Sequence, residues 1–593
     1  MIIKSLEIQN YRKMDGSKFD FNKKRNYIVG KNNIGKTSTL NLLETLLTCK
    51  NFQPDDFDKA NKPITINLKV DLAEEEIGVF DDNFSPENSN EIIIKFEQES
   101  IDDPLKFYHF DTKSDIRASQ LKKSNLISYS SNIKPIKTRD LLTEYGDYKF
   151  IPNMVKHYIE KNRPPKITKT DYDKELLSYL NSNLKKIRPF EEGNVIIDFA
   201  KDYTEIINGS LKLENTDNID FSKLGFGLQF STLIPLKIID QIIKWKKYNR
   251  LDDHLIKNNK NKKVLNIILT VDEPEVHLYP NLQLKLMKYI NNILAGKNKD
   301  FNNLLNNLFD IDEIQGQLFV VTHSPYILSN CNYKEVIRLT EVKKKLFVVS
   351  GVNIKFSSSE QKQLKRKLTD INSSLFADSV IIVEGDTEQI AFKIFAQTLG
   401  IDLIEYNTNI MKADGIKNVF ILSKLFDEFK IKNSLVIDSD GKDILEIKKN
   451  YLKGRKKPDN LFITCEKDFE HECFENMSLS SINHYLSDFE KSINKKNYNG
   501  SFWFKVFSKT DKNKIKNSKD IVTTIDQILD SFTKDKDKEK ETKNCIKTDF
   551  MKNFLKKKSI LNGELIARYT NPVPRAYKDA IEYVTEYQTK EGK

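Results

Sequence analysis

The chain contains the stretch Gly30-Lys31-Asn32-Asn33-Ile34-Gly35-Lys36-Thr37, which matches the pattern G-x-x-x-x-G-K-[ST] of a phosphate-binding loop. It follows the apolar run Tyr27-Ile28-Val29 and leads into residues 38–44, which favour a helix. In such a strand–loop–helix unit the backbone amides surround the phosphate oxygens, the lysine neutralises them and the threonine hydroxyl holds Mg²⁺. The sequence therefore predicts an ATP site formed by Gly30, Asn33, Gly35, Lys36, Thr37 and Ser38.

Two further apolar runs carry polar residues where they end. Residues 264–271 form a near-continuous apolar run followed by Asp272 and Glu273, the pattern of a buried parallel strand with acids at its carboxyl end. We expect Asp272 to reach Mg²⁺ through water and Glu273 to act as the general base for the attacking water. The run 318–321 is followed by His323, which we expect to sense the γ-phosphate.

A glycine-rich turn lies between these two parts of the predicted ATP site. The stretch Leu224-Gly225-Phe226-Gly227-Leu228-Gln229-Phe230 opens an apolar helix and resembles the signature loop of ABC-type ATPases. In that class the signature loop of one subunit caps ATP held by the other subunit. The resemblance implies a homodimer or higher homo-oligomer in which Gly225, Gly227 and Gln229 contact ATP. Gly225 stands where the class usually has serine, so amides at the helix start would have to meet the γ-phosphate. A plain helix-capping turn is the alternative.

The second half of the chain carries a different chemistry. The apolar run 379–383 ends in Glu384-Gly385-Asp386-Thr387-Glu388, and the run 434–437 ends in Asp438-Ser439-Asp440. Residues 388–399 between them have helical spacing, so these βα units predict a parallel sheet with carboxylates gathered at one edge. On an extended segment, Asp438 and Asp440 would project to the same side. Such clusters suit Mg²⁺ or Mn²⁺, and two such ions can cleave a phosphodiester.

The order Glu-Gly and then Asp-x-Asp resembles the TOPRIM domain of topoisomerases, bacterial primases and one family of nucleases. An ABC-type ATPase followed by a TOPRIM domain resembles the OLD (overcoming lysogenisation defect) family, which includes the Gabija nuclease-ATPase and retron-associated effectors. The opening segment 2–12 is also typical of these ATPases. The resemblance implies an α/β fold, with an ABC-type P-loop ATPase domain that carries a helical insertion and precedes a Rossmann-like TOPRIM domain. It also implies an ATP-gated, Mg²⁺- or Mn²⁺-dependent DNA endonuclease that serves in antiphage defence.

The resemblance adds further site residues. Glu388 fits the family's second acid, one helical turn after Glu384, and the acidic element Asp468-Phe469-Glu470 fits its later ligands. The implied nuclease-metal ligands are Glu384, Glu388, Asp438, Asp440, Asp468 and Glu470, and Thr37 and Asp272 would hold the ion at ATP. The family also uses a lysine near the carboxyl terminus, for which Lys558 is the first candidate and Lys578 the second. A solvated lysine is the alternative at both positions. Ala413-Asp414-Gly415 departs from the family, where a Gly-Gly turn is expected.

Length and composition agree with this interpretation. The 593 residues predict three or four domains, and the net charge of +11 favours a polyanionic partner such as DNA. No apolar run is long enough for a membrane span, and the first residues enter a strand rather than a signal peptide. The five cysteines form no Cys-x-x-Cys pair, which argues against the usual zinc frameworks and fits a cytoplasmic protein.

The motifs also predict the domain boundaries. We expect the first part of the ATPase domain at 1–150, a helical and dimerising insertion at 151–218, the second part of the ATPase domain at 219–355, a linker at 356–375, the TOPRIM domain at 376–490 and a lysine-rich helical region that completes it at 491–593. Partners implied by the family are a helicase-like protein, or a reverse transcriptase with its noncoding nucleic acid.

A second function remains open at this stage. In it the TOPRIM domain does not cleave, and the chain is an ATP-switched DNA-binding module of a repair or recombination complex. The number of predicted acidic ligands favours the nuclease, because a binding module does not need them. The glycine-rich turn and the second acidic site argue against a small-molecule kinase.

Overall fold

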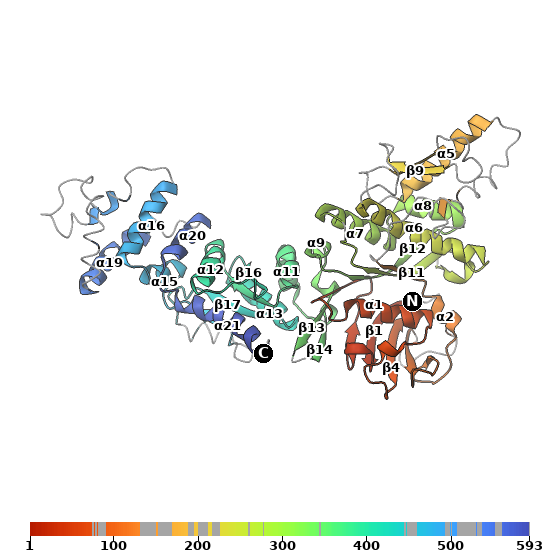
Figure 1. The fold of residues 1–593 in the computed structure, drawn as a ribbon, viewed down its shortest axis with the longest axis horizontal. Coiled ribbons are helices and arrows are strands. Elements are labelled where there is room, and N and C mark those ends of the chain that lie inside the picture. Colours follow the sequence, from red (N-terminus) through yellow and green to blue (C-terminus); the bar gives the residue numbers. More distant parts are fainter. Residues whose placement is uncertain are drawn as a thin grey trace. The chain divides into compact units, whose positions relative to one another are not determined.

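A computed structural model describes residues 1–73, 76, 80, 90–130, 150–151, 154, 169–187, 195–199, 211–215, 226–258, 261–276, 278–342, 345–443, 446, 459–492, 499, 501–503, 505–506, 529, 536–551 and 560–591. The chain forms two compact units, Met1–Lys355 and Phe356–Lys593, which are described separately below (Figure 1). Among the described residues, no helix combines the length and the apolar character that crossing a bilayer requires.

The first unit contains an antiparallel sheet and a mainly parallel sheet. The antiparallel sheet has the order β2 (Lys18–Asp20), β1 (Ile2–Gln9), β4 (Ile64–Asp71), β5 (Glu91–Gln98) and β6 (Lys106–His109). The other sheet has the order β10 (Leu255–Lys257), β11 (Lys263–Asp272), β12 (Glu313–Val321), β3 (Arg25–Gly30), β13 (Val336–Val342) and β14 (Lys345–Ser350), and β7 (Leu126–Ser130) also pairs with β11. Strands β7, β11, β12, β3 and β13 are parallel to their neighbours among these five.

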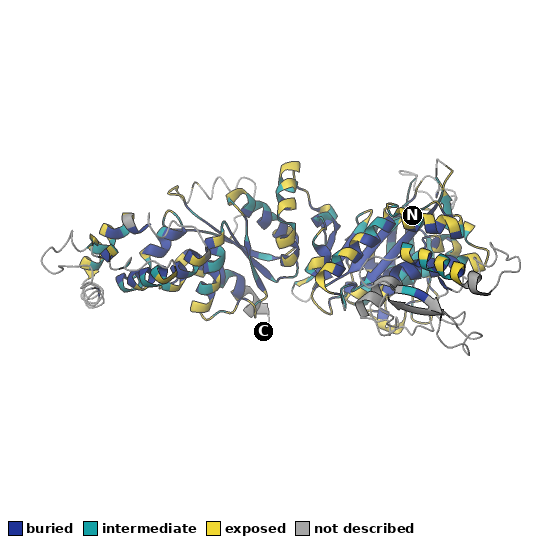
Figure 2. Cartoon of the chain, turned by 90° about the horizontal axis from the view of Figure 1, so that it is seen from above, coloured by how far each residue is buried: buried dark blue, intermediate teal, exposed yellow. Residues whose placement is uncertain are grey.

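Helices cover both faces of the mainly parallel sheet, which explains why its central strands are almost wholly apolar. Helix α1 (Lys36–Thr48) lies between the two sheets, in a core that includes Leu43 and Phe319. Helices α6 (Phe226–Lys247), α7 (Pro280–Leu294) and α8 (Lys299–Phe309) lie on the other face (Figure 1). Figure 2 shows the strands between them buried.

Strand register brings three loops to one edge of this sheet. Asp272, at the end of β11, pairs with Val321 of β12, and Val321 pairs with Ile28 of β3. The chain segments that follow these strands therefore leave the sheet side by side. They are the phosphate-binding loop, the acidic pair after β11 and the histidine segment after β12.

The second unit is built on a parallel sheet with the order β16 (Thr408–Lys412), β15 (Ser379–Val383), β17 (Lys432–Ile437) and β18 (Leu461–Ile463). Helix α12 (Asp386–Thr398) and the distant helix α21 (Arg575–Glu591) share one core with Ile381 and Val383 of β15. The alternate residues Val380 and Ile382 are also buried, and α13 (Ile416–Glu428) packs on the sheet. Helices α15 (Phe469–Glu475), α16 (Leu479–Ser492), α19 (Lys536–Phe550) and α20 (Ile560–Tyr569) extend this core.

Two segments differ from the sequence-based expectation. Residues 356–375, interpreted as a linker, form helices α10 (Ser358–Arg366) and α11 (Leu368–Ser374). Ser357 begins α10 through a capping box, because its side chain accepts from the Glu360 N–H and the Glu360 side chain accepts from the Ser357 N–H. The region 151–218, expected to be mostly helical, contains α5 (Lys169–Lys186) and also an antiparallel pair, β8 (Val195–Phe199) and β9 (Leu211–Asn215).

The contact between α20 and α12 gives a first prediction. A Cβ at Gly563 of α20 would lie 2.8 Å from the Thr387 carbonyl oxygen of α12, so only glycine lets the two helices approach this closely. We expect Gly563→Ala to lower the free energy of unfolding by about 1–3 kcal/mol, although alanine normally favours a helix. Urea unfolding measures this. Leu561→Ala, at an exposed position of the same helix, is the control with little effect. A Gly563→Ala protein as stable as the wild type would contradict the described contact.

Candidate nucleotide and metal sites

The phosphate-binding loop depends on backbone conformations that favour glycine. Gly30 ends β3 with φ 154°, and a Cβ there would lie 2.5 Å from the Leu339 carbonyl oxygen of β13. Gly35 begins α1 with φ 106°, and Asn33 between them has a left-handed φ of 59°. Glycine at both ends therefore lets the loop leave β3 and enter α1 within a few residues.

Lys36 places a positive charge inside this loop. The side chain is buried, and Nζ donates to the carbonyl oxygens of Gly30 at 3.1 Å and of Lys31 at 2.6 Å. Burial lowers the pKa of Lys36, while the charges of Glu273 and Asp272 oppose that shift. The position suits neutralisation of phosphate oxygens at a helix start.

Thr37 connects the loop to the end of β11. Its hydroxyl donates to Oδ1 of Asp272 at 3.3 Å, and burial raises the pKa of Asp272. A hydroxyl and a carboxylate in contact are the protein groups that hold Mg²⁺ in phosphate-binding-loop ATPases. Ser38 accepts a hydrogen bond from Nη1 of Arg12 at 3.0 Å, so Arg12 is tied to the same loop.

Glu273 and His323 face each other beside the lysine. Glu273 has a left-handed φ of 48°, and its N–H donates to Val321 at 2.9 Å. Its Oε1 lies 3.7 Å from Nε2 of His323. Burial and the charge of Lys36 lower the pKa of His323, so the imidazole is neutral at physiological pH. The geometry allows Glu273 to act as a base next to a neutral histidine.

Sequence reasoning missed two contributors to this site. Glu275 accepts from the Thr322 hydroxyl at 2.9 Å and from the His323 N–H at 2.5 Å, and thus fixes the histidine segment. The loop, Glu273 and His323 line one cavity of about 1060 Å³ together with Arg12, Lys13, Met14, Asp55, Phe57 and Asp58. Among these additional lining residues, only Arg12 lies in a segment, 2–12, that the sequence analysis had related to such ATPases. Of the signature-loop residues, Gly227 and Gln229 lie in the first turn of α6, and Gly225 lies outside the described residues.

The second unit brings most of the predicted nuclease acids together. Glu384 follows β15, Glu388 lies in the first turn of α12, Asp438 follows β17 and Glu470 lies in the first turn of α15. All four line one cavity of about 500 Å³. The Asp438 N–H donates to Oε1 of Glu384 at 3.4 Å, and the Gly385 N–H donates to Oε2 of Glu388 at 2.5 Å. The carboxyl edge of the parallel sheet therefore carries an acidic pocket.

The charge balance of this pocket favours a divalent cation. Burial raises the pKa of Asp438 to about 8, and the charges of Glu388, Glu384, Glu470 and Asp468 add to the shift. Oxygen donors with excess negative charge are the ligands that Mg²⁺ and Mn²⁺ prefer. Within the described residues, no three His, Cys, Asp or Glu side chains are already close enough to share one ion. The donor chemistry fits such an ion, and side-chain rotation would have to complete the ligand set.

Two acids at the rim of the pocket have lysine partners. Lys412 lies 2.8 Å from Asp386 and 3.2 Å from Asp414, and Lys367 also pairs with Asp414. Asp414 has a left-handed φ of 56° and precedes Gly415 with φ 112°. The departure from a Gly-Gly turn is thus accommodated, because aspartate tolerates this conformation and two lysines hold it in place.

The structure does not bring Asp440 into the pocket. The prediction assumed an extended segment, but β17 ends at Ile437 and the chain then turns, with φ 52° at Asp440. Asp440 is exposed, and its N–H donates to the Lys467 carbonyl oxygen at 2.7 Å. A ligand role for Asp440 stays a prediction that requires this turn to change.

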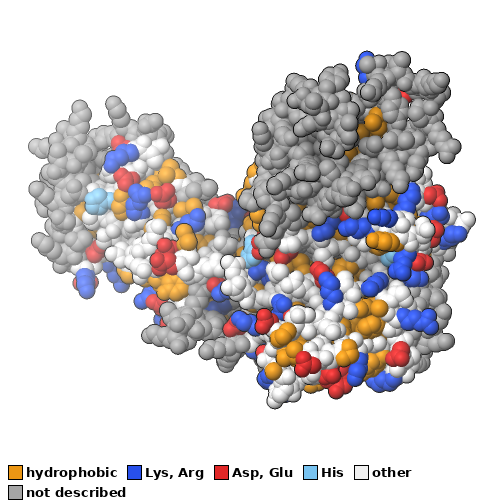
Figure 3. All heavy atoms as spheres, turned by 45° about the vertical axis from the view of Figure 1, so that its right-hand side comes forward, with side chains coloured by type: hydrophobic (Ala, Val, Ile, Leu, Met, Phe, Trp, Pro, Cys, Tyr) orange, Lys and Arg blue, Asp and Glu red, His pale blue; other side chains and the backbone are white. Residues whose placement is uncertain are grey.

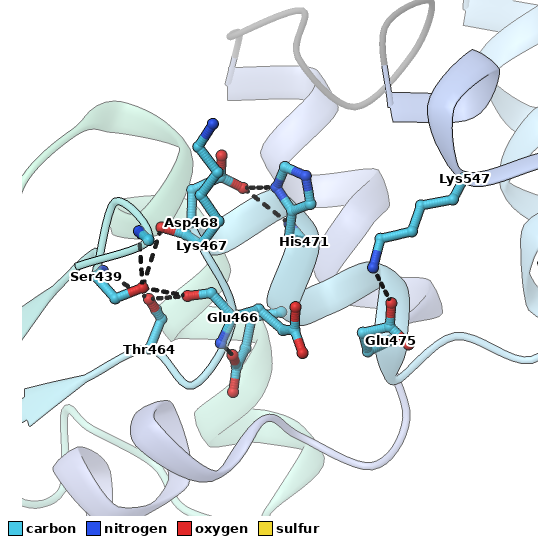
Figure 4. A network of polar contacts seen from close by, with 10 residues as sticks. Ser439, Thr464, Glu466, Lys467, Asp468, His471, Glu475 and Lys547 are labelled. Atoms are coloured by element: carbon cyan, nitrogen blue, oxygen red, sulfur yellow. Dashed lines mark hydrogen bonds and ion pairs between the residues drawn. The ribbon is translucent and has the colours of Figure 1, made fainter. Parts of the chain in front are cut away.

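The remaining candidates lie around the pocket or outside the described residues. Asp468 precedes α15 and caps its first turn, since Oδ1 accepts from the His471 N–H at 3.0 Å (Figure 4). Lys558 lies outside the described residues. Lys578 of α21 is half exposed and lies 3.7 Å from Glu582 of the same helix.

Comparison with known proteins identifies a domain in each of the two units. Residues 375–440 match the overcoming lysogenization defect protein-like TOPRIM domain, and residues 1–193 and 168–328 match an AAA ATPase domain. The chain belongs to the AAA ATPase domain family and carries an OLD-like TOPRIM domain. The family prediction made from the order of the motifs is confirmed, and so is the predicted fold class of a P-loop ATPase followed by a TOPRIM domain.

Similarity to OLD-family relatives extends over much of the chain. It is 23% identical over 573 residues to Endonuclease GajA of Bacillus cereus (strain HuB5-5), covering 76% of this chain and 78% of that protein. It is 25% identical over 227 residues to the Old nuclease of Escherichia phage P2, covering 37% of this chain and 34% of that protein. A solved Smc head bound to the C-winged helix domain of ScpA covers 59% of this chain and 98% of the head, with 12% identity and a TM-score of 0.33, too low to carry an argument.

The phosphate-binding loop and the acidic pair after β11 give a second prediction. Lys36→Ala is expected to abolish ATP binding, because the phosphates lose the cation inside the loop. Glu273→Gln is expected to bind ATP and to hydrolyse it about 100-fold more slowly or worse, because only the base is lost. Calorimetry and phosphate release measure the two effects. Glu44→Gln changes a partly exposed residue of α1 and is the matched control. If the Glu273→Gln variant hydrolysed ATP at the wild-type rate, Glu273 would not be the general base.

The acidic pocket gives a third prediction, about pH. Because the pKa of Asp438 is raised from 3.8 to about 8, the folded protein retains a proton that the unfolded chain loses. The protonated Asp438 side chain therefore stabilises the folded protein. This contribution is fully present below pH 3.8 and is lost as the pH rises through about 8. We therefore expect metal-free protein to lose stability across this window, and Mg²⁺ to raise Tm more at pH 8 than at pH 5.

Asp438→Asn should flatten both dependences, and Glu564→Gln on α20 should leave them as in the wild type. Thermal unfolding at several pH values measures them. An Asp438→Asn protein with the wild-type pH profile would show that Asp438 is not the residue responsible.

Proposed function

We propose that this protein is an ATP-gated, metal-dependent endonuclease of the OLD type that cuts DNA. The observation that carries the proposal is the single cavity lined by Glu384, Glu388, Asp438 and Glu470 at the carboxyl edge of the TOPRIM sheet. Two relatives, Endonuclease GajA and the Old nuclease, are named for nuclease activity. The acidic cavity and the names of these relatives both favour phosphodiester hydrolysis in the second unit.

The pocket residues have distinct roles in this proposal. Glu384 and Asp438 are adjacent through the 3.4 Å hydrogen bond and would share one ion, and Glu388 and Glu470 would hold a second. Bound Mg²⁺ or Mn²⁺ supplies a nucleophilic water and stabilises the leaving oxygen. Lys412 and Lys367 neutralise the rim acids Asp386 and Asp414, which lowers the repulsion that the pocket presents to a phosphate. A carboxyl-terminal lysine, with Lys558 first, would stabilise the developing negative charge.

The ATPase unit is proposed to control cleavage. Thr37 and Asp272 would hold the Mg²⁺ that accompanies ATP, Glu273 would activate water and His323 would sense the γ-phosphate. Gly225, Gly227 and Gln229 would close the site of a second copy, which makes the active form a homodimer or higher homo-oligomer. Light scattering that finds only monomers in the presence of ATP would overturn this part.

A defence role is proposed for the whole protein, with DNA as substrate. A helicase-like protein, or a reverse transcriptase with its noncoding nucleic acid, is the proposed class of partner. The net charge of +11 favours attraction to DNA. Figure 3 shows lysines and arginines interspersed with acids on the face it presents, so the visible described surface carries no continuous basic track.

One observation favours a second function, in which the TOPRIM domain binds DNA without cutting it. Asp440 lies outside the pocket and its backbone is held in a turn. If this turn persists when DNA is bound, the pocket lacks one acid of the predicted set. The protein would then be an ATP-switched DNA-binding module of a repair or recombination complex.

Substitutions in the pocket distinguish the two functions and give a fourth prediction. Purified protein should cut DNA in the presence of Mg²⁺ or Mn²⁺ and should show no cleavage in EDTA. Glu384→Gln and Glu388→Gln should each reduce cleavage about 1000-fold or more, because the ions lose a ligand. Asp386→Asn is the matched control, since its carboxylate lines the same pocket but pairs with Lys412, and it should retain cleavage within a few fold.

ATP binding by the variants should equal that of the wild type, which separates a local loss from misfolding. A Glu384→Gln, Asp438→Asn double variant that cuts as fast as the wild type would end the nuclease proposal. Wild-type protein that binds DNA but never cuts it, with ATP and either metal present, would establish the binding module instead.

A further inference from the structure

Asp468 is held by one neighbouring residue, His471. Its Oδ1 accepts from the His471 N–H at 3.0 Å and also contacts Nδ1 of the His471 ring (Figure 4). Both side chains are more than four-fifths buried, at 17% and 18% exposed. Because a carboxylate only accepts hydrogen bonds, the ring must carry its proton on Nδ1. Oδ1 is thus occupied twice, while Oδ2 has no hydrogen bond among the described residues.

The backbone around Asp468 is fixed to the loop that follows Asp438. The Ser439 N–H donates to the Thr464 hydroxyl at 3.0 Å, and the Ser439 hydroxyl donates to the Glu466 carbonyl oxygen at 2.7 Å. The Thr464 hydroxyl donates to the same Glu466 carbonyl oxygen at 2.8 Å. Figure 4 shows these contacts as one connected network. The network fixes the backbone near residue 468 relative to the loop after Asp438, but the side chain of Asp468 is not part of it.

The Asp468 side chain is oriented by His471, through the backbone cap and through the ring. Asp468 directly precedes Phe469 and Glu470, which line the acidic pocket, and its charge acts on Asp438. A carboxylate that must bind an ion gains affinity when a neighbour orients it beforehand, because less side-chain entropy is lost on binding. The backbone cap holds Oδ1 by one hydrogen bond and can form with any residue at position 471, whereas the second contact, from Nδ1 of the ring, depends on the histidine.

We propose that His471 is a positioning residue for the acidic pocket: its Nδ1–H fixes Asp468 so that Oδ2 is presented to the divalent cation. This inference rests on the proposed metal-dependent function. His471 does not touch substrate and acts through Asp468. Its effect should therefore appear in the affinity for metal rather than in the rate at saturating metal.

The test measures Mn²⁺ binding to the full chain by calorimetry, with cleavage as a second readout. His471→Ala should weaken Mn²⁺ binding about 10-fold or more, the usual effect of losing a residue that orients a metal ligand. Cleavage should return to within a few fold of the wild type at saturating Mn²⁺. His471→Asn places an amide N–H near the position of Nδ1 and should restore most of the affinity. His484→Ala, an exposed histidine of α16, is the control with no effect.

A double-variant cycle tests whether His471 acts through Asp468. Asp468→Asn keeps the helix cap, because asparagine caps as well as aspartate, but it removes the charged ligand. Adding His471→Ala to it should cause no further loss of Mn²⁺ affinity. Wild-type Mn²⁺ binding by His471→Ala, or additive losses in the double variant, would overturn the inference and leave the nuclease proposal standing. Absence of Mn²⁺ binding by the wild-type protein would overturn both.

Discussion

Parallel pairing of buried strands is the constraint on which both sites depend. In the first unit, Val321 pairs with Asp272 on one side and Ile28 on the other, so loops from three distant parts of the chain leave the sheet at one level. In the second unit, β15 and β17 are parallel neighbours, so Glu384 and Asp438, which follow them directly, lie next to each other. A shift of one residue in either register would turn alternate side chains to the other face and disperse the charged groups.

Sequence reasoning succeeded where the signal is local and the context is a buried strand. The spacing within residues 30–37 fixes a loop of known geometry, and the apolar runs before Asp272 and Asp438 show where parallel strands end. The family followed from the order of these motifs, and the family comparison confirms it. Each of these predictions needed only a short window of sequence and the rule that open α/β sheets place their sites at the carboxyl edge.

Sequence reasoning failed where the chain turns or where partners are far apart. Asp440 was placed by the alternation of an extended strand, but a turn begins directly after Ile437. The serines at 357–359 were interpreted as the start of a linker, but Ser357 and Glu360 form the capping box with which α10 begins. Glu275 accepts a hydrogen bond from the N–H of His323, which lies 48 residues further along the chain, and no local sequence pattern predicts such a contact.

The packing of α20 and α21 has a consequence for biosynthesis. Helix α12, which carries Glu388, shares its core with residues near the end of the chain, among them Tyr577, and α20 approaches it at Gly563. A nascent chain on the ribosome has already exposed its ATP-binding loop and all the pocket acids before these helices emerge. Its acidic pocket is nevertheless unfinished, because the wall behind α12 is still missing. Completion of the acidic pocket is thereby tied to the synthesis of α20 and α21, at least ninety residues after the last of the four acids that line it.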